Sequence, residues 1–181
     1  MATTHLPCQA DVVRPDGKLP DNHLRLTITR VPQSQRVSKQ SLQFNIVFES
    51  IGQDDTLLNL GIMLGNGISQ IPTNVYLLLT DSSGKTRRLE VRGVGIAGRV
   101  DPLVVPLSGS STYTIKADLQ QYWSPKTKEF DLKIGTGKYR IAAEFAGDSK
   151  RIGNEDMINT DLMNMFKGKV RSNELIFEIK D

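Results

Sequence analysis

The chain is poor in the residues that small proteins use for disulfide bonds, metal sites and nucleophilic catalysis. Its 181 residues include one cysteine, Cys8, and two histidines, His5 and His23. A single cysteine excludes an intramolecular disulfide, and these three residues do not have the spacing of a zinc site. A Ser-His-Asp centre would need one of the two histidines, and no Gly-x-Ser-x-Gly sequence is present. We therefore expect a protein that is not an enzyme and that holds neither a metal nor a cofactor.

The chain also lacks long hydrophobic runs and a strong charge of either sign. It has no run of about 18 apolar residues, which excludes a membrane-spanning helix. The net charge is +3, from 23 basic and 20 acidic residues, and this balance does not indicate a nucleic-acid partner. The N-terminus has no basic segment followed by an apolar one, so no signal peptide is visible. We expect a cytoplasmic protein, or an extracytoplasmic one if an export signal has been removed ahead of Met1.

What the sequence does contain is a regular alternation of apolar and polar residues. The segment Gly135–Gly147 places Tyr139, Ile141, Ala143 and Phe145 on one side of the chain. A period of two is typical of a β-strand with one face on a core and the other in water. Further strands are expected at His23–Arg30, Leu42–Glu49, Asp55–Met63, Asn74–Thr80, Arg87–Arg92, Thr112–Leu119 and Asn173–Lys180.

These segments, separated by turn signals at intervals of about 8–12 residues, predict an all-β domain. We expect two antiparallel sheets packed face to face, with one short helix, Asn154–Phe166, inserted before the last strand. A jelly roll or an open barrel is the alternative, because the same alternation permits both. Residues 1–21 have no periodicity and are expected to form an irregular arm, so the sandwich domain would span residues 22–181.

Two glycine-containing motifs suggest a nucleotide site, but their surroundings argue against one. Gly93–Gly98 has the spacing of a dinucleotide-binding fingerprint, which requires a helix directly after the glycines. Pro102 and Pro106 follow instead and make a helix implausible. Gly84–Thr86 reads Gly-Lys-Thr without the upstream glycine of a phosphate-binding loop, and Asp81–Lys85 is typical of a hairpin turn.

Two groups of carboxylates lack the spacing of a calcium-binding loop. The first is Asp54 and Asp55, and the second is Glu155, Asp156 and Asp161. We interpret them as turn and helix-capping residues, and whether either group holds a metal stays open at this point.

The lead-in to Tyr139 resembles the corner before a late strand of an immunoglobulin-like sandwich, with Asp131, Gly135 and Gly137 ahead of the tyrosine. Ile141 stands where the cysteine of the antibody-type disulfide would be. Residues 40–181 loosely resemble uncharacterised bacterial immunoglobulin-like domains. The matching positions are Asp81–Gly84, Leu107 and Gly109 before Tyr113, Leu132–Tyr139, and Ser172, Asn173, Leu175, Phe177 and Ile179.

The resemblance implies an immunoglobulin-like antiparallel sandwich and brings no catalytic residues with it. Related domains are frequently exported, and some precede enzymatic domains. We therefore expect a binding or accessory module with a protein or carbohydrate partner. A small protease inhibitor that uses the loops Gly65–Pro72 or Gly93–Pro102 is the alternative, and an accessory domain of a larger secreted enzyme is the third reading. The oligomeric state is left open.

Two sets of side chains are candidate contacts for such a partner. Tyr122 and Trp123 lie in an otherwise polar loop, where a flat aromatic ring offers a large contact area at low entropy cost. Arg87, Arg88 and Arg92 form the clearest local cluster of basic residues. The competing interpretation is that Trp123 caps the open end of the core and that the arginines belong to a solvated strand face.

Overall fold

A computed structural model describes residues 23–31, 42–65, 69–92, 100–126, 132, 134–147 and 165–179. These residues are almost entirely β-structure, with one turn of 3-10 helix at Leu119–Gln121. The strands are β1 (Leu24–Arg30), β2 (Gln43–Ser50), β3 (Thr56–Leu64), β4 (Gln70–Ile71), β5 (Val75–Thr80), β6 (Thr86–Val91), β7 (Val100–Leu107), β8 (Thr112–Asp118), β9 (Tyr122–Trp123), β10 (Gly137–Ala146), β11 (Lys169–Arg171) and β12 (Leu175–Ile179).

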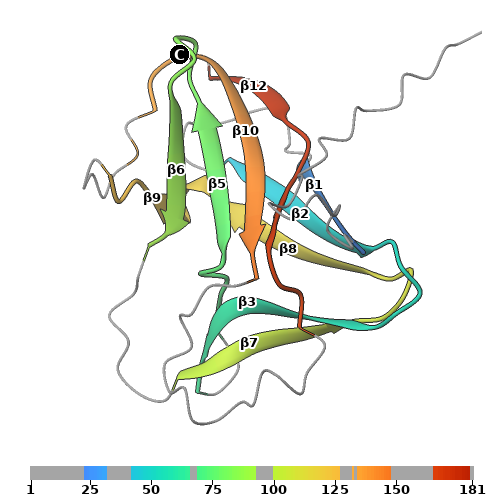
Figure 1. Cartoon of the computed structure of the whole chain (residues 1–181). Coiled ribbons are helices and arrows are strands. Elements are labelled where there is room, and N and C mark those ends of the chain that lie inside the picture. The colour runs from blue at the N-terminus through green and yellow to red at the C-terminus, as the bar shows by residue number, and fades with distance from the viewer. Residues whose placement is uncertain are drawn as a thin grey trace, which may run out of the picture.

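The strands form two facing sheets and a smaller third sheet below them (Figure 1). One sheet has the order β1-β2-β8. The facing sheet has the order β11-β10-β5-β6-β9, and β12 also pairs with β10. The small sheet has the order β4-β3-β7, and every ladder in the three sheets is antiparallel. The predicted all-β antiparallel sandwich is therefore confirmed.

The strand order is that of an immunoglobulin-like sandwich. Strands β1, β2 and β8 occupy the places of strands A, B and E, and β12, β10, β5 and β6 occupy those of G, F, C and C′. The chain thus makes β1 and β2 in one sheet, β5 and β6 in the facing sheet, β8 back in the first sheet, and β10 and β12 again in the second. Tyr139, predicted to lie at the corner before a late strand, stands near the beginning of β10.

A long bent ribbon of two strands links the sheet β1-β2-β8 to the small sheet. Strands β2 and β8 pair with each other, and their continuations β3 and β7 pair in the small sheet. The register of β3 against β7 shifts between Asn59 and Gly61, where an irregularity accommodates the bend. Gly61 has φ +137°, and a Cβ atom there would overlap the backbone nitrogen of Thr73. A glycine is needed at this position because both the backbone angle and the space exclude a side chain.

The core lies between the two sheets and is built from the inward residues of the alternating strands. Phe44 and Phe48 on β2 face Phe177 and Phe145 across the sandwich, with ring centroids 5.9 Å and 5.4 Å apart. The second pair meets edge to face, an arrangement that aromatic rings prefer over direct stacking. The predicted core residues Phe44, Ile46, Ile141, Phe145 and Phe177 are all buried.

Four strands were not predicted, and the end of the expected helix is wrong. One is the eight-residue β7, whose Pro102 and Pro106 are tolerated because it lies at the edge of its sheet. Strands β4, β9 and β11 have two or three residues, too few to show a period of two. Met165 forms a bridge with Leu57, and the backbone nitrogen of Phe166 donates a hydrogen bond to the carbonyl of Leu57. These last two residues of the predicted helix are therefore in extended pairing. Residues 154–164 of that helix, and the predicted arm 1–21, lie outside the described residues.

Candidate functional site

Tyr122, predicted as an exposed partner contact, belongs to the core. It pairs with Val91 of β6, and its residue surface is 2% exposed. Burial raises the pKa of its hydroxyl, because the ionised form would lose its solvation. The hydroxyl oxygen has no hydrogen-bond partner in the described part of the chain. The prediction for Tyr122 is wrong because the loop forms a strand here, and a strand turns alternate residues to opposite faces.

Trp123 lies on the opposite face from Tyr122. It stands directly across from Glu90 of β6, and residues opposite each other in a ladder share a face. Glu90 alternates with the buried Leu89, so this face points away from the core. Trp123 is half-buried. The structure thus places one of the two predicted aromatic residues on the surface of the larger sheet.

The three arginines predicted as a basic strip are not on one surface. Arg88 lies on the outer face of β6, and its side chain is partly exposed. Arg87 alternates with it and shares the inner face with Leu89 near the beginning of the strand. Arg92 follows the strand and lines a cavity. Period-two alternation separates neighbouring residues in the sequence, so a basic run on a strand does not become a basic patch.

Arg88 joins three strands across the outer face. Its guanidinium carbon is 3.5 Å from the ring centroid of Tyr76 on β5. Its Nη2 atom is 3.0 Å from Oε1 of Glu144 on β10, which stands directly opposite Tyr76. Tyr76 is 7% exposed although it points away from the core, because the guanidinium lies over its ring. The cation–π contact and the ion pair hold Arg88 in one orientation.

We define the outer patch as the five side chains Tyr76, Arg88, Glu90, Trp123 and Glu144. They come from β5, β6, β9 and β10, and the ladder registers place all five on the outer face of the larger sheet. Sequence alternation assigns Tyr76 to the face opposite the core. The pairing of β6 with β9, which brings Trp123 into the row, cannot be read from the sequence, because β9 is too short to show an alternation.

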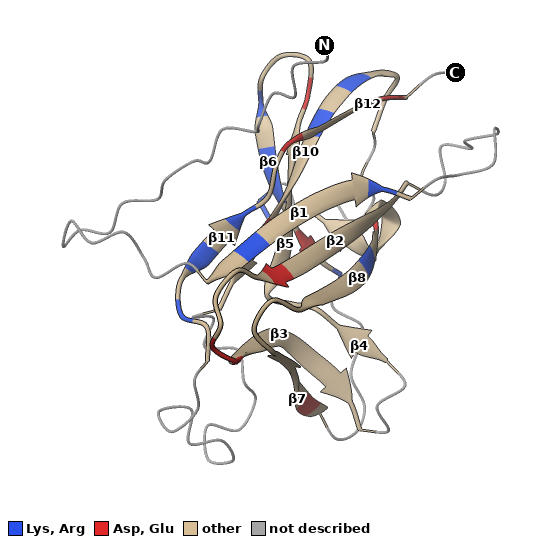
Figure 2. Ribbon diagram, turned by 90° about the vertical axis from the view of Figure 1, so that its right-hand side faces the viewer, with Lys and Arg blue, Asp and Glu red and all other residues tan. Residues whose placement is uncertain are grey.

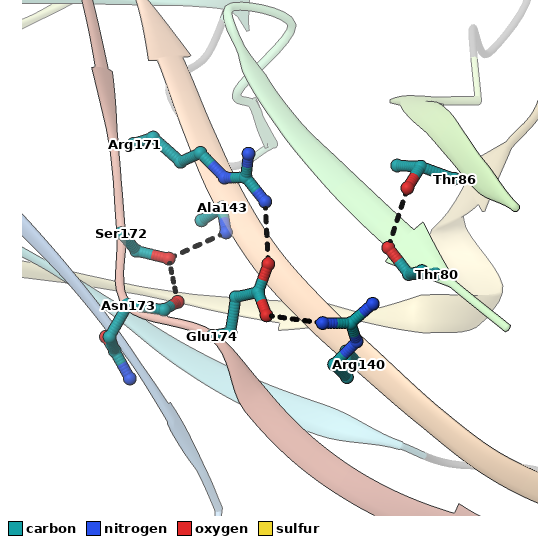
Figure 3. A network of polar contacts seen from close by, with 8 residues as sticks. All are labelled: Thr80, Thr86, Arg140, Ala143, Arg171, Ser172, Asn173 and Glu174. Atoms are coloured by element: carbon teal, nitrogen blue, oxygen red, sulfur yellow. Dashed lines mark hydrogen bonds and ion pairs between the residues drawn. The ribbon is translucent and has the colours of Figure 1, made fainter. Parts of the chain in front are cut away.

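The remainder of this face carries a network of polar contacts (Figure 3). Glu174 accepts hydrogen bonds from Arg171 and Arg140, at 2.9 Å and 3.4 Å. Ser172 Oγ accepts a bond of 2.8 Å from the backbone nitrogen of Ala143 and donates one to the carbonyl of Asn173. Basic and acidic residues are interspersed over both sheets (Figure 2). The face has no single sign of charge.

A cavity of about 320 Å³ opens at the end of the sandwich beside β6 and β8. Five of its seven lining residues are aliphatic, and the other two bring a guanidinium and an amide. The lining residues are Leu42, Arg92, Leu119, Gln120, Leu132, Ile134 and Ile179. Among the described residues, Arg92 and Gln120 supply the polar side chains of its lining.

Only part of the predicted carboxylate groups and inhibitor loops lies within the described residues. Asp55 Oδ1 accepts a hydrogen bond from the backbone nitrogen of Gly109, which agrees with a turn role. Within the described ranges, no three His, Cys, Asp or Glu side chains gather closely enough to hold a metal ion. Residues 66–68 and 93–99 of the predicted inhibitor loops, and the acidic group at Glu155, Asp156 and Asp161, lie outside the described residues.

Comparisons with known proteins add no functional assignment. No protein-family model matches the chain, and no curated protein matches it. One solved structure to which it is similar is the X-ray structure of Northeast Structural Genomics Consortium target SoR45, at 11% identity and a TM-score of 0.38. The match covers 88% of this chain and 89% of that one. A likeness of this degree establishes neither a shared fold nor a shared function. Among the described residues, no helix has the length and apolar character needed to cross a membrane.

Proposed function

We propose that this chain is a non-enzymatic binding or accessory module whose partner is a protein that docks on the outer patch. The observation that carries the proposal is the row formed by Trp123, Tyr76 and Arg88 on one rigid sheet face. These are the three residue types that contribute most often to the energetic centre of protein interfaces. They lie on adjacent strands, so the patch needs no rearrangement to present them together.

The composition of the patch favours a protein over a carbohydrate. Carbohydrate sites depend on an aromatic face left open for the sugar ring to stack on. Arg88 covers the ring of Tyr76, which leaves Trp123 as the aromatic side chain of the patch with more open surface. Glu90 and Glu144 add carboxylates to the same row. A protein surface with its own mixture of apolar and charged groups complements this arrangement.

The decisive experiment substitutes Trp123→Ala and compares it with Ile176→Ala. Ile176 is 70% exposed on β12 of the same sheet but lies outside the outer patch, so it is a matched apolar control. Proteins from the native source are captured on each variant after chemical cross-linking, and the captured partner is then purified and titrated. We expect a partner that binds the wild type and I176A alike and binds W123A at least about tenfold more weakly.

Thermal melting of the same variants separates binding from folding. We expect W123A to melt within a few degrees of the wild type, since Trp123 lies outside the core. A large loss of melting temperature would assign Trp123 to the core instead. Equal binding of a purified partner by W123A and the wild type would exclude the outer patch as its docking site.

A further inference from the structure

The sheet β1-β2-β8 has two edge strands, and among the described residues only one of them has its outer backbone groups bonded to a neighbouring side chain. The edge of β1 is capped by the side chain of Asn173. Its Oδ1 accepts a hydrogen bond of 2.9 Å from the backbone nitrogen of Ile28, and its Nδ2 donates one of 3.2 Å to the carbonyl of Ile28. At the other edge, no described strand pairs with β8 on the side away from β2. Figure 2 shows β8 as the outermost strand of this sheet.

The register identifies which backbone groups β8 presents at its open edge. The backbone nitrogens of Ser50 and Leu119 donate to the carbonyls of Ser111 and Leu42, so odd-numbered residues of β8 point towards β2. In an antiparallel ladder the intervening residues point the other way. The N–H and C=O groups of Thr112, Thr114 and Lys116 therefore line the open edge.

Other edges of the described structure carry devices that discourage pairing with another chain. The edge continues from β8 into β7, where Pro102 and Pro106 stand opposite Ile62 and Leu57. The carbonyl of Leu57 accepts a bond from Phe166, so the Leu57–Pro106 pair makes no ladder bonds, and the nitrogen of Pro106 faces the open edge. A proline at an edge removes a donor that another strand would need.

Strand β8 has no proline and, within the described part of the chain, no side-chain cap along this edge, and Lys116 is its one protective residue of the kind found on edge strands. Its seven residues, TYTIKAD, contain no proline and pair with β2 in an unbroken register. Thr, Tyr and Ile favour strands, and Lys116 is the one basic residue among them. By contrast, β9 covers part of the edge of β6, and the outer strand β12 has five residues and carries Glu178. A seven-residue open edge of this kind is a template for an added strand.

We propose that β8 pairs with β8 of a second copy of this chain. The two strands run antiparallel about a two-fold axis at Ile115, which joins the two three-stranded sheets into one of six strands. In this register Thr114 faces Lys116 of the second copy, and Thr112 faces its Asp118. All seven residues are paired, and no like charges stand directly opposite.

This self-complementarity favours a second copy over an unrelated strand. An isologous pair also occupies both open edges and leaves neither for further growth. The contact involves one strand from each copy, which is less area than a permanent dimer buries. The dimer is therefore weak, and the dimeric fraction rises over the micromolar to millimolar range.

The test uses opposite charges at one position. Sedimentation velocity is recorded from about 10 µM to about 1 mM for the wild type, T114K and T114E. The lysine introduced by T114K would face Lys116 of the second copy twice in the dimer, so this variant raises the dissociation constant about tenfold. T114E places a carboxylate opposite the same lysine and lowers the constant. Controls T29K and T29E make the same charge changes at an exposed site of β1 in the same sheet, and they leave it unchanged.

Backbone amide exchange provides a second readout that does not depend on substitution. The amides of Thr112, Thr114 and Lys116 exchange more slowly as the wild-type concentration rises, whereas the capped amide of Ile28 does not change. A wild type that stays monomeric up to about 1 mM overturns the proposal. So does a dimer that shifts in the same direction with T114K and T114E, or that responds to the Thr29 controls as strongly as to the Thr114 variants.

Discussion

The hydroxyl of Tyr139 donates a hydrogen bond of 3.0 Å to the carbonyl of Gly135, four residues earlier in the chain. The bond closes the turn that leads into β10, the central strand of the larger sheet. The ring of Tyr139 also stacks on Phe177, with centroids 5.6 Å apart. One side chain thus ties the turn before β10 to the core, as the tyrosine corner of immunoglobulin-like sandwiches does.

Replacing this hydroxyl tests its contribution to stability. Tyr139→Phe keeps the ring in the core and removes the bond to Gly135, so we expect the free energy of unfolding to fall by about 1 kcal/mol. Urea denaturation monitored by circular dichroism measures the difference. Tyr113→Phe is the control, because no hydrogen bond of its hydroxyl is seen among the described residues. Equal stability of Y139F and the wild type would show that the corner bond adds nothing.

The cap formed by Asn173 predicts a local effect at β1. Asn173→Ala removes both hydrogen bonds to Ile28, and we expect a loss of about 1–2 kcal/mol in the free energy of unfolding. The amide of Ile28 should then exchange faster than the amides of neighbouring β1 residues that bond to β2. Asn173→Asp keeps the acceptor and loses the donor, so it should slow this exchange relative to the alanine variant. Unchanged protection of Ile28 in N173A would contradict the cap.

The buried hydroxyl of Tyr122 predicts a stabilising substitution. It has no hydrogen-bond partner in the described part of the chain, so Tyr122→Phe removes a desolvated polar group without opening a cavity. We expect the variant to gain about 1 kcal/mol and to melt roughly 2–4 °C higher. Differential scanning calorimetry measures both quantities. A loss of stability would show that an ordered water satisfies the hydroxyl.

The same burial determines the response to alkaline pH. The pKa of Tyr122 is higher in the folded chain than in the unfolded chain, so its contribution to stability is complete below the unfolded pKa, about 10. The contribution is lost as the pH rises from that value towards the folded pKa. The free energy of unfolding should therefore fall above about pH 10 in the wild type and less steeply in Y122F.

The turn between β5 and β6 predicts a response to acid. The pKa of the Asp81 carboxyl is lowered from its ordinary 3.8, chiefly by the hydrogen bond from the Ser83 hydroxyl and further by the backbone N–H groups of Lys85 and Ser83. The stability from these bonds is present above the unfolded pKa and is lost as the pH falls through the lower folded pKa. NMR titration should show the pKa of Asp81 rising in Ser83→Ala and staying unchanged in Ser82→Ala.

Much of the fold could be predicted from the sequence because the core residues alternate with polar ones. Phe44, Ile46 and Ile141 are buried as the period of two indicates, and the turn at Asp81–Lys85 follows from its Asp, Ser and Gly residues. Strands of two or three residues, such as β9 and β11, are too short to show a period. Their pairing depends on neighbours that are distant in the chain, so no local pattern reports it.

The candidate site shows the same division more sharply. Tyr122 and Trp123 are adjacent in the sequence and were predicted to act together, yet β9 sends one into the core and the other to the surface. Tyr76 and Arg88 lie on the two arms of the hairpin that the sequence predicts, whereas Glu144 comes from the distant β10 and reaches Arg88 because β10 also pairs with β5. The order of the strands in the sheet decides which of these side chains come into contact.

The order of side chains along the backbone, by itself, determined that the chain forms half-buried strands and which residues fill the layer between them. Burying apolar groups is a local tendency that each strand expresses through its own alternation. Only the tertiary structure decided which strand lies beside which. That choice depends on long-range pairing, and it places Glu144 beside Arg88, caps β1 with Asn173 and leaves the edge of β8 without a described neighbour.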